Sequence, residues 1–282
     1  MKVVSTISEA RVIMKGAGAG GRTIGFVPTM GALHEGHLSL VKSATSDCDF
    51  TVASIFVNPI QFNDTKDYNT YPRDVKKDLA LLEKGDIDLV FIPSVEEMYR
   101  ENTVTYVSVE KLSGVLEGRL RPGHFRGVCT VVSKLFNIIA PDRAYFGWKD
   151  AQQLIIIRKM VTDLDIPVEI IGCPTIREKD GLAVSSRNIF IGSGERDKAL
   201  CLYKSLKMIE NLVLGKGIRD TKVLLEEGRK IISKYPDVEL QYLEIADMEN
   251  LEHVERAEGR VLVLGAIGLS RVRLIDNLIL SV

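Results

Sequence analysis

The sequence predicts an α/β protein with a Rossmann-like parallel sheet in its N-terminal domain and a smaller α+β C-terminal domain. First, strand-like apolar runs alternate with helix-like segments up to residue 175, which is typical of a parallel sheet with helices on both faces. Second, two helical segments and then three strand-like runs follow, as in an α+β domain. Third, the length of 282 residues suits one large domain or two smaller ones. We therefore expect domains at 1–176 and 177–282.

The individual elements follow from periodicity and residue type. Runs of β-branched and aromatic residues predict strands, and apolar residues at helical spacing predict helices. The strands expected in the N-terminal domain are Thr23–Thr29, Phe50–Asn58, Ile87–Pro93, Ala144–Phe146 and Val168–Cys173. The helices expected there are Leu38–Ala44, Asp74–Lys84, Val128–Ile139 and Ala151–Leu164. The C-terminal domain is expected to hold a polar loop at Gly181–Asn188, helices at Glu195–Leu214 and Thr221–Lys234, and strands at Glu239–Ala246, Arg260–Ile267 and Arg271–Leu280, with a hairpin turn at Gly268–Ser270.

Composition argues against several classes of protein. Lys and Arg number 37 against 38 Asp and Glu, a net charge of −1, so no broadly basic surface for nucleic acid is expected. No apolar run reaches the roughly 18 residues that span a bilayer, and the N-terminus lacks a secretory signal pattern. The four cysteines are widely spaced and form no C-x-x-C pair, which indicates free thiols in a reducing compartment. We expect a cytoplasmic protein with no nucleic-acid or membrane partner.

A glycine-rich stretch imitates a nucleotide-binding loop. Gly16–Thr23 reads GAGAGGRT, which fits G-x-G-x-x-G and nearly fits a Walker A loop, with Arg22 in place of lysine. Both motifs need the glycines to follow a strand and open a helix, so that helix amides face the phosphate. Here the glycines follow a helical segment and precede a strand. We interpret them as a flexible helix-to-strand loop.

Two of the four histidines lie three residues apart. His34 and His37 occur in PTMGALHEGHLSLV, directly after an apolar strand and at the start of a helix. Ligands of open α/β sheets bind at the carboxyl ends of strands, and a helix start offers N–H donors and partial positive charge. The pattern predicts binding and charge stabilisation of a polyphosphate. The alternatives are structural histidines or a zinc site, which would need a third protein ligand.

A second polar stretch near the predicted domain boundary also suits phosphate. Arg177–Asn188 reads REKDGLAVSSRN. Ser185, Ser186 and Arg187 offer hydroxyls, backbone amides and a guanidinium, which can pair with phosphate oxygens in a bidentate manner. Taken alone, the stretch could equally be a polar loop between domains.

Several motifs together carry a family resemblance. The H-x-G-H element resembles that of nucleotidylyl-transferases and class I aminoacyl-tRNA synthetases, which implies attack at the α-phosphate of ATP with pyrophosphate as the leaving group. Further motifs are FVNPIQF at Phe56–Phe62, RPGHFRG at Arg121–Gly127, AYFGWKDAQQ at Ala144–Gln153 and RLIDN at Arg273–Asn277. In this order, with the two stretches above, they resemble the pantoate–β-alanine ligase family from residue 23 to the end.

That resemblance implies a reaction. It is the ATP-dependent condensation of (R)-pantoate with β-alanine to pantothenate, AMP and pyrophosphate, through a pantoyl-adenylate. ATP as substrate, Mg²⁺ and a homodimer are implied, as is a C-terminal domain that closes over the nucleotide- and pantoate-binding domain. The alternatives are another H-x-G-H adenylyltransferase that acts on a different small carboxylate or phosphate, and a non-catalytic nucleotide sensor.

The resemblance also implies roles for individual residues. His37, His34, Lys149 and Arg187 would act in catalysis by offsetting charge on the phosphates. Gln61 and Gln153 would bind pantoate, and Gln61 would border β-alanine; metal ligands stay unassigned. The residues expected to bind ATP are Met30, Gly31, Ala32, Leu33, His34, Glu35, Gly36, His37, Gly147, Trp148, Lys149, Asp150, Ile176, Val184, Ser185, Ser186 and Arg187.

Two positions depart from the family pattern. Trp148 stands where the family usually has a polar or charged residue, which leaves the ribose side of the pocket undefined. Val184 stands where methionine, leucine or lysine is more usual. Asn58, His124 and Arg126 lie in matching motifs, but their roles stay open between function, structure and a dimer contact.

Overall fold

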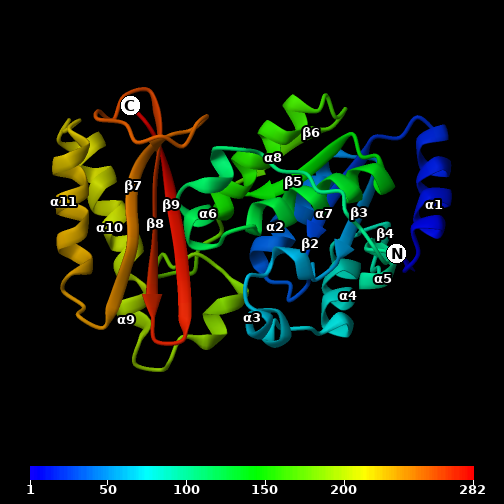
Figure 1. Ribbon diagram of the computed structural model, residues 1–282, viewed down its shortest axis with the longest axis horizontal. Coiled ribbons are helices and arrows are strands. Elements are labelled where there is room, and N and C mark those ends of the chain that lie inside the picture. Colours follow the sequence, from blue (N-terminus) through cyan, green and yellow to red (C-terminus); the bar gives the residue numbers. More distant parts are fainter. The chain divides into compact units, whose positions relative to one another are not determined.

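The computed structural model describes residues 1–282. The chain forms two compact units: an N-terminal unit, Met1–Trp148 with Gln152–Pro174, and a C-terminal unit, Lys149–Ala151 with Thr175–Val282. A parallel sheet lies in the first unit and a three-stranded antiparallel sheet in the second, so the fold class expected from the sequence is confirmed (Figure 1). None of the helices is both long and apolar enough to cross a membrane.

A six-stranded parallel sheet forms the centre of the N-terminal unit. In the order β1-β4-β3-β2-β5-β6, its strands are β1 (Lys2–Val4), β4 (Leu89–Phe91), β3 (Phe50–Ile55), β2 (Ile24–Thr29), β5 (Arg143–Gly147) and β6 (Glu169–Cys173). Strand β3 is buried along its whole length. A strand covered on both faces has no solvent-facing polar side, which explains why the sequence here is mostly apolar and why Thr51 and Ser54 are buried as well.

Helices cover both faces of this sheet (Figure 1). Val27 and Tyr145 point to the face that packs against α2 (Glu35–Asp47) and α4 (Val75–Lys84). On the other face, the rings of Phe26 and Phe136 meet edge to face at 6.4 Å. The remaining helices of the unit are α1 (Ile7–Ala19), α3 (Thr65–Thr70), α5 (Val95–Met98), α6 (Glu117–Leu120), α7 (His124–Ile139) and α8 (Ala151–Asp163).

The direction of strand succession reverses between β2 and β5. From β2 the chain proceeds outward through β3 and β4, whereas β5 pairs with the other side of β2 and is followed outward by β6. Gly25 pairs with Arg143 and Phe26 with Ala144, a register that, if continued, sets Thr29 beside Gly147. Ligands of open α/β sheets bind outside the carboxyl ends of the strands at such a switch point. The ends of β2 and β5 are therefore the place to look for a site.

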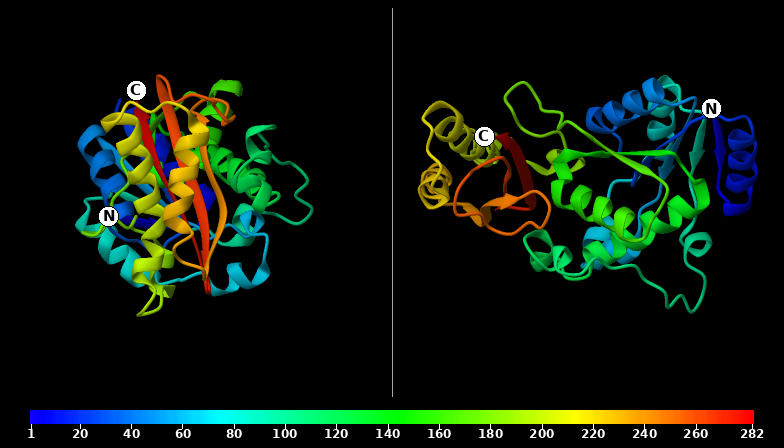
Figure 2. Two further views of the ribbon diagram at one scale, coloured as in Figure 1. Left: turned by 90° about the vertical axis from the view of Figure 1, so that its left-hand side faces the viewer. Right: turned by 90° about the horizontal axis from the view of Figure 1, so that it is seen from above.

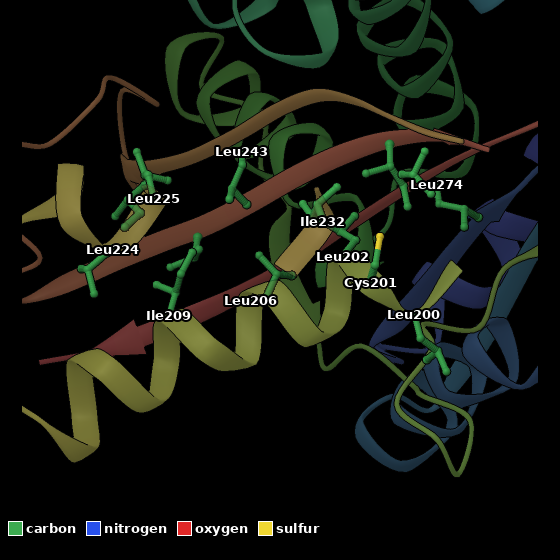
Figure 3. Packing of buried hydrophobic residues seen from close by; sticks show 14 of the residues in the cluster. Leu200, Cys201, Leu202, Leu206, Ile209, Leu224, Leu225, Ile232, Leu243 and Leu274 are labelled. Carbon is green, nitrogen blue, oxygen red and sulfur yellow. The ribbon is translucent and has the colours of Figure 1, made fainter. Parts of the chain in front are cut away.

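The C-terminal unit is an antiparallel sheet with two helices on one face. The sheet holds β7 (Val238–Asp247), β8 (Arg260–Leu269) and β9 (Val272–Ser281), and the helices are α10 (Cys201–Glu210) and α11 (Thr221–Ile232), as Figure 2 shows. Leu202, Leu206 and Ile209 recur at helical spacing on α10 and belong to one buried cluster with strand residues such as Leu243 (Figure 3). This apolar stripe explains why α10 packs on the sheet.

The prediction of one continuous helix at Glu195–Leu214 is wrong in detail. The chain forms α9 (Arg196–Ala199) and α10, followed by a π-helical turn at Asn211–Gly215. Two successive apolar residues of this turn, Leu212 and Val213, are both buried, at 5% and 0% exposed.

The loops predicted at Gly16–Thr23 and Gly268–Ser270 are both longer than the loops in the structure. Helix α1 continues to Ala19, so only the last glycines lie between helix and strand, although the helix-to-strand order is as expected. At the hairpin, Leu269 still pairs with Val272, which leaves Ser270 and Arg271 as a two-residue turn. Ser270 has a positive φ of 48°, as tight hairpin turns require.

Candidate active site

The turn from β2 to α2 lies at the carboxyl edge of the sheet. Helix α2 begins at Glu35, with His34 as its N-cap residue. Gly31 and Ala32 have φ values of 78° and 50°, so the chain folds sharply between strand and helix. Glycine is required at position 31, because a Cβ there would lie 2.8 Å from an oxygen of Asp78 and 3.1 Å from Ile55. The turn places the start of α2 where the sheet topology places a ligand.

The two histidines of the turn lie together and share one pattern of hydrogen bonds. Their ring centroids are 4.1 Å apart. Nδ1 of His34 accepts from the amide of Gly36 at 3.2 Å, and Nδ1 of His37 accepts from the amide of His34 at 3.3 Å. Since both Nδ1 atoms are acceptors, the proton of each neutral ring lies on Nε2. Each Nε2–H is thus the group that can donate to an anion at the start of α2.

Asp78 of α4 supports this turn and was not singled out by the sequence. Its side chain is 1% exposed. The carboxylate accepts the amide of Ala32 at 3.0 Å and that of Leu33 at 2.8 Å. Burying a carboxylate is costly unless hydrogen bonds satisfy it, and these two amides do so. Asp78 therefore fixes the two residues that precede His34.

Gln61 lies beside the same turn. It ends a short 3₁₀ helix, Pro59–Gln61, that follows β3, the strand next to β2. Its side chain is 7% exposed, and Nε2 lies 3.0 Å from the sulfur of Met30. The fold thus brings Gln61 and Met30, two predicted site residues 31 positions apart, into contact.

A buried network orients Gln61. Asn58 donates to Oε1 of Gln61 at 2.9 Å and to the carbonyl of Gly127 at 3.1 Å, and accepts from the hydroxyl of Tyr99 at 2.8 Å. Nδ1 of His124 lies 2.8 Å from the Gln61 carbonyl. Of the residues whose roles the sequence left open, Asn58 and His124 therefore contact Gln61.

Arg126, the third residue whose role the sequence left open, packs against an aromatic ring. Its guanidinium lies over the ring of Tyr106, 4.1 Å from the centroid, in a cation–π contact. The neighbouring Gly127 allows α7 to approach the Pro59–Gln61 turn closely, because a Cβ there would lie 2.5 Å from the carbonyl of Ile60.

Two adjacent glutamines at the start of α8 have different environments. Gln152 is 3% exposed, accepts from the amide of Glu117, and donates to the carbonyls of Leu112 and Val115. Gln153, the predicted substrate-binding residue, is half-buried. The hydrogen bonds of Gln152 therefore fix the 112–117 segment, whereas Gln153 lies on a different face of the helix start.

At the end of β5, Trp148 packs along the sheet. A Cβ on Gly172 of β6 would lie 2.6 Å from the indole Nε1, and the Arg158 guanidinium lies 5.1 Å from the ring. The large side chain that departs from the family pattern is thus accommodated by glycine on the adjacent strand and by a cation above it. Gly147, which precedes it, ends β5.

The other predicted ATP residues belong to the C-terminal unit. Lys149 and Asp150 lie in a 3₁₀ turn, Trp148–Asp150. The amide of Val184 donates to the carbonyl of Ile176 at 2.9 Å, which closes a hairpin over residues 176–184. The hydroxyl of Ser185 accepts the amide of Arg187 at 3.3 Å. The hairpin therefore ends in a turn that presents the serine and arginine side chains together.

Comparisons with known proteins agree over the full chain. A family model described as pantoate-beta-alanine ligase matches residues 2–279. A pantothenate synthetase of Thermotoga petrophila is 54% identical over 281 residues, which cover 100% of both chains. Among solved structures, a pantothenate synthetase of Thermus thermophilus has a TM-score of 0.93 and 45% identity, with 99% of each chain covered. Pantoate-beta-alanine ligase of Francisella tularensis, complexed with beta-gamma ATP and beta-alanine, has a TM-score of 0.81 and 35% identity, with 99% of this chain and 97% of that chain covered.

Proposed function

This chain belongs to the pantoate–β-alanine ligase family, and we propose that it condenses pantoate with β-alanine to form pantothenate, with conversion of ATP to AMP and pyrophosphate. The observation that carries the proposal is the pair of imidazoles at the start of α2, each with Nδ1 accepting a backbone amide. The relatives and neighbouring structures named above give no support to the alternative of a different adenylyltransferase substrate.

The first half-reaction activates the pantoate carboxylate. A carboxylate oxygen attacks the α-phosphorus of ATP, the bond to the bridging oxygen breaks, and pyrophosphate leaves with its electron pair. Negative charge grows on the phosphate oxygens. The Nε2–H groups of His34 and His37 are donors fixed before the reaction by the hydrogen bonds at Nδ1, so they stabilise this charge without reorganising. Lys149 and Arg187 would supply further positive charge.

Mg²⁺ would arrive with the nucleotide. The structure contains no group of three or more His, Cys, Asp or Glu side chains that could hold a metal ion. Mg²⁺ usually keeps water and phosphate ligands rather than an all-protein cage, so the phosphates of ATP would be its main ligands. When bound, the ion would neutralise charge on the phosphates.

The second half-reaction forms the amide bond. The neutral amine of β-alanine attacks the adenylate carbonyl, AMP leaves, and the amine releases a proton. Gln61 and Gln153 would hold the hydroxyl and carboxylate groups of pantoate through both steps, since catalysis here depends on positioning. The hydrogen bond from Asn58 to Oε1 of Gln61 leaves Nε2 of Gln61 as the side-chain donor toward the substrate.

The other implied properties belong to the same proposal. We expect Met30–His37 and Gly147–Asp150 to bind ATP, Ile176 to contact adenine through its backbone, and Val184–Arg187 to close on the triphosphate. A homodimer, a cytoplasmic location and closure of the C-terminal domain remain predictions from the family resemblance and from the composition.

The decisive experiment separates the two half-reactions. Purified protein is incubated with Mg²⁺, ATP and pantoate, and exchange of labelled pyrophosphate into ATP is measured without β-alanine. Pantoate-dependent exchange, with AMP and pantothenate appearing only once β-alanine is added, supports the adenylate route. ADP and phosphate as products would show an acyl-phosphate route instead. Folded protein without any pantoate-dependent reaction would overturn the assigned substrate.

A further inference from the structure

The motif RLIDN at Arg273–Asn277 has no role in the reaction described so far. It lies on β9, and its last two residues, Asp276 and Asn277, are each only 6% exposed. Polar and charged side chains are rarely buried to this extent unless they have partners. Because successive side chains of a strand point to opposite faces, the two neighbours can hold different segments.

Asp276 holds the base of the 176–184 hairpin. Its two carboxylate oxygens accept from the two terminal nitrogens of Arg177, at 2.7 and 2.9 Å. The Arg177 side chain is 17% exposed. A bidentate pair of this kind fixes orientation as well as distance, so the first strand of the hairpin is clamped to β9.

Arg177 then extends this clamp through the hairpin. It donates to the carbonyl of Gly181 at 3.0 Å and to that of Asn277 at 3.1 Å, and its guanidinium lies 4.5 Å from the centroid of the Tyr203 ring. Gly181 has a φ of 100°, and a Cβ there would lie 2.0 Å from the Tyr203 ring. One guanidinium therefore links β9, α10 and the tip of the hairpin that leads into Ser185.

Asn277 holds a second segment. Its side-chain amide donates to the carbonyl of Lys149 at 3.0 Å. Lys149 and the hairpin are far apart in the sequence but belong to the same compact unit. Two adjacent residues of one strand thus contact the turn that holds Lys149 and the base of the hairpin that leads into Ser185.

We propose that Asp276 and Asn277 are positioning residues for ATP: Asp276 acts through Arg177 on the turn Ser185–Arg187, and Asn277 acts on the backbone of Lys149. This inference rests on the proposed function, because it takes these two segments as ATP-binding. Neither residue touches the reacting atoms. Their effect is to set the spacing between a lysine and an arginine that must meet the same polyphosphate.

The test uses the full chain and measures the two half-reactions separately. Adenylation is followed by pantoate-dependent ATP–pyrophosphate exchange over a range of ATP concentrations. Aminolysis is followed with synthetic pantoyl-adenylate and β-alanine, where no triphosphate is present. We expect Asp276→Asn to raise the KM for ATP about 10- to 100-fold, as expected when bonds between charged partners are lost. The rate of aminolysis should stay at the wild-type value.

Two further variants guard against an effect on folding alone. Asn277→Ala leaves the ion pair intact and should raise the KM for ATP by about 2- to 10-fold, as for one neutral hydrogen bond; it carries the test if Asp276→Asn does not fold. Leu243→Ala removes a buried side chain of β7, 2% exposed, and should lower thermal stability with the KM for ATP unchanged.

The outcomes separate this inference from the proposed function. An unchanged KM for ATP in both polar variants, or equal losses in adenylation and aminolysis, would overturn the positioning role. If wild-type protein shows no pantoate-dependent exchange, the proposed function itself fails. If the wild-type protein is active and both variants keep its KM for ATP, only the role of Asp276 and Asn277 is refuted.

Discussion

Replacing Asp78 with asparagine tests whether its carboxylate holds the turn before α2. The two carboxylate oxygens accept amides at 3.0 and 2.8 Å. Asparagine keeps the shape but has only one oxygen, so either Ala32 or Leu33 would face an NH₂ group that cannot accept. A hydrogen bond to a charged group contributes about 1.5–3 kcal/mol, and one of the two is lost.

The effect on kinetics depends on whether the free energy of the lost hydrogen bond is missing from the free protein or only from the ATP-bound protein. In the free protein the turn can relax until the unpaired amide reaches water, whereas bound ATP requires the original conformation. We therefore expect most of the cost in nucleotide binding, as a rise of roughly 10- to 150-fold in the KM for ATP. If the cost fell on folding instead, the melting temperature would drop by about 2–4 °C for each kcal/mol.

Initial rates of pyrophosphate exchange, together with thermal unfolding followed by circular dichroism, measure both quantities. Met14→Ala is the matched control. Met14 is 5% exposed on α1, a helix that carries none of the proposed site residues, and its truncation should cost about 2–5 kcal/mol of stability. The reasoning is refuted if Asp78→Asn loses thermal stability as Met14→Ala does and keeps the wild-type KM for ATP.

Three further predictions concern single side chains. His37→Ala should lower kcat by about 10²- to 10³-fold, the effect of losing one charge-stabilising donor, with little change in melting temperature; wild-type initial rates would remove its role at the phosphates. Gln153→Ala should raise the KM for pantoate without loss of stability, whereas Gln152→Ala should lower the melting temperature, since it loses three buried hydrogen bonds; the reverse result in kinetics and thermal unfolding would contradict both assignments. Burial raises the pKa of the Cys129 thiol from 9.0 to about 12, so the native state holds this proton more tightly than the unfolded state. The stability that this provides is complete below pH 9 and is lost as the pH rises toward 12, by up to about 1.4 kcal/mol per pH unit; urea unfolding across this range should show a shallower pH dependence for Cys129→Ala, and an identical slope would exclude the thiol as its source.

The parallel sheet could be predicted because strands buried on both faces are visible in the sequence. β2 and β3 are mostly apolar and show no alternation of polar and apolar residues, and the helices between strands show apolar faces. β1 could not be predicted, because three residues, Lys2–Val4, are too few to show a period. The π-helical turn after α10 escaped prediction for a different reason: the identities of Leu212 and Val213 fit a regular helix equally well until the core that they enter is known.

The histidine turn could be predicted from local sequence, but its supports could not. His34 and His37 follow a strand and open a helix, and this pattern is local. Asp78 looks like any acidic residue near a helix start, such as Asp74, the N-cap of the same helix. Only the packing of α4 against α2 brings its carboxylate to Ala32. Asn277 is comparable, since its contact with Lys149 joins residues 128 positions apart.

Trp148 makes the end of β5 directly observable. It is the only tryptophan of the chain, it lies against Gly172 beneath the Arg158 guanidinium, and it immediately precedes Lys149. Indole emission excited at the red edge of the absorption band therefore comes from this one ring. A nucleotide that shifts the neighbouring turn changes the surroundings of the single emitter, so the protein carries its own optical reporter for titrations and stopped-flow measurements without an attached dye.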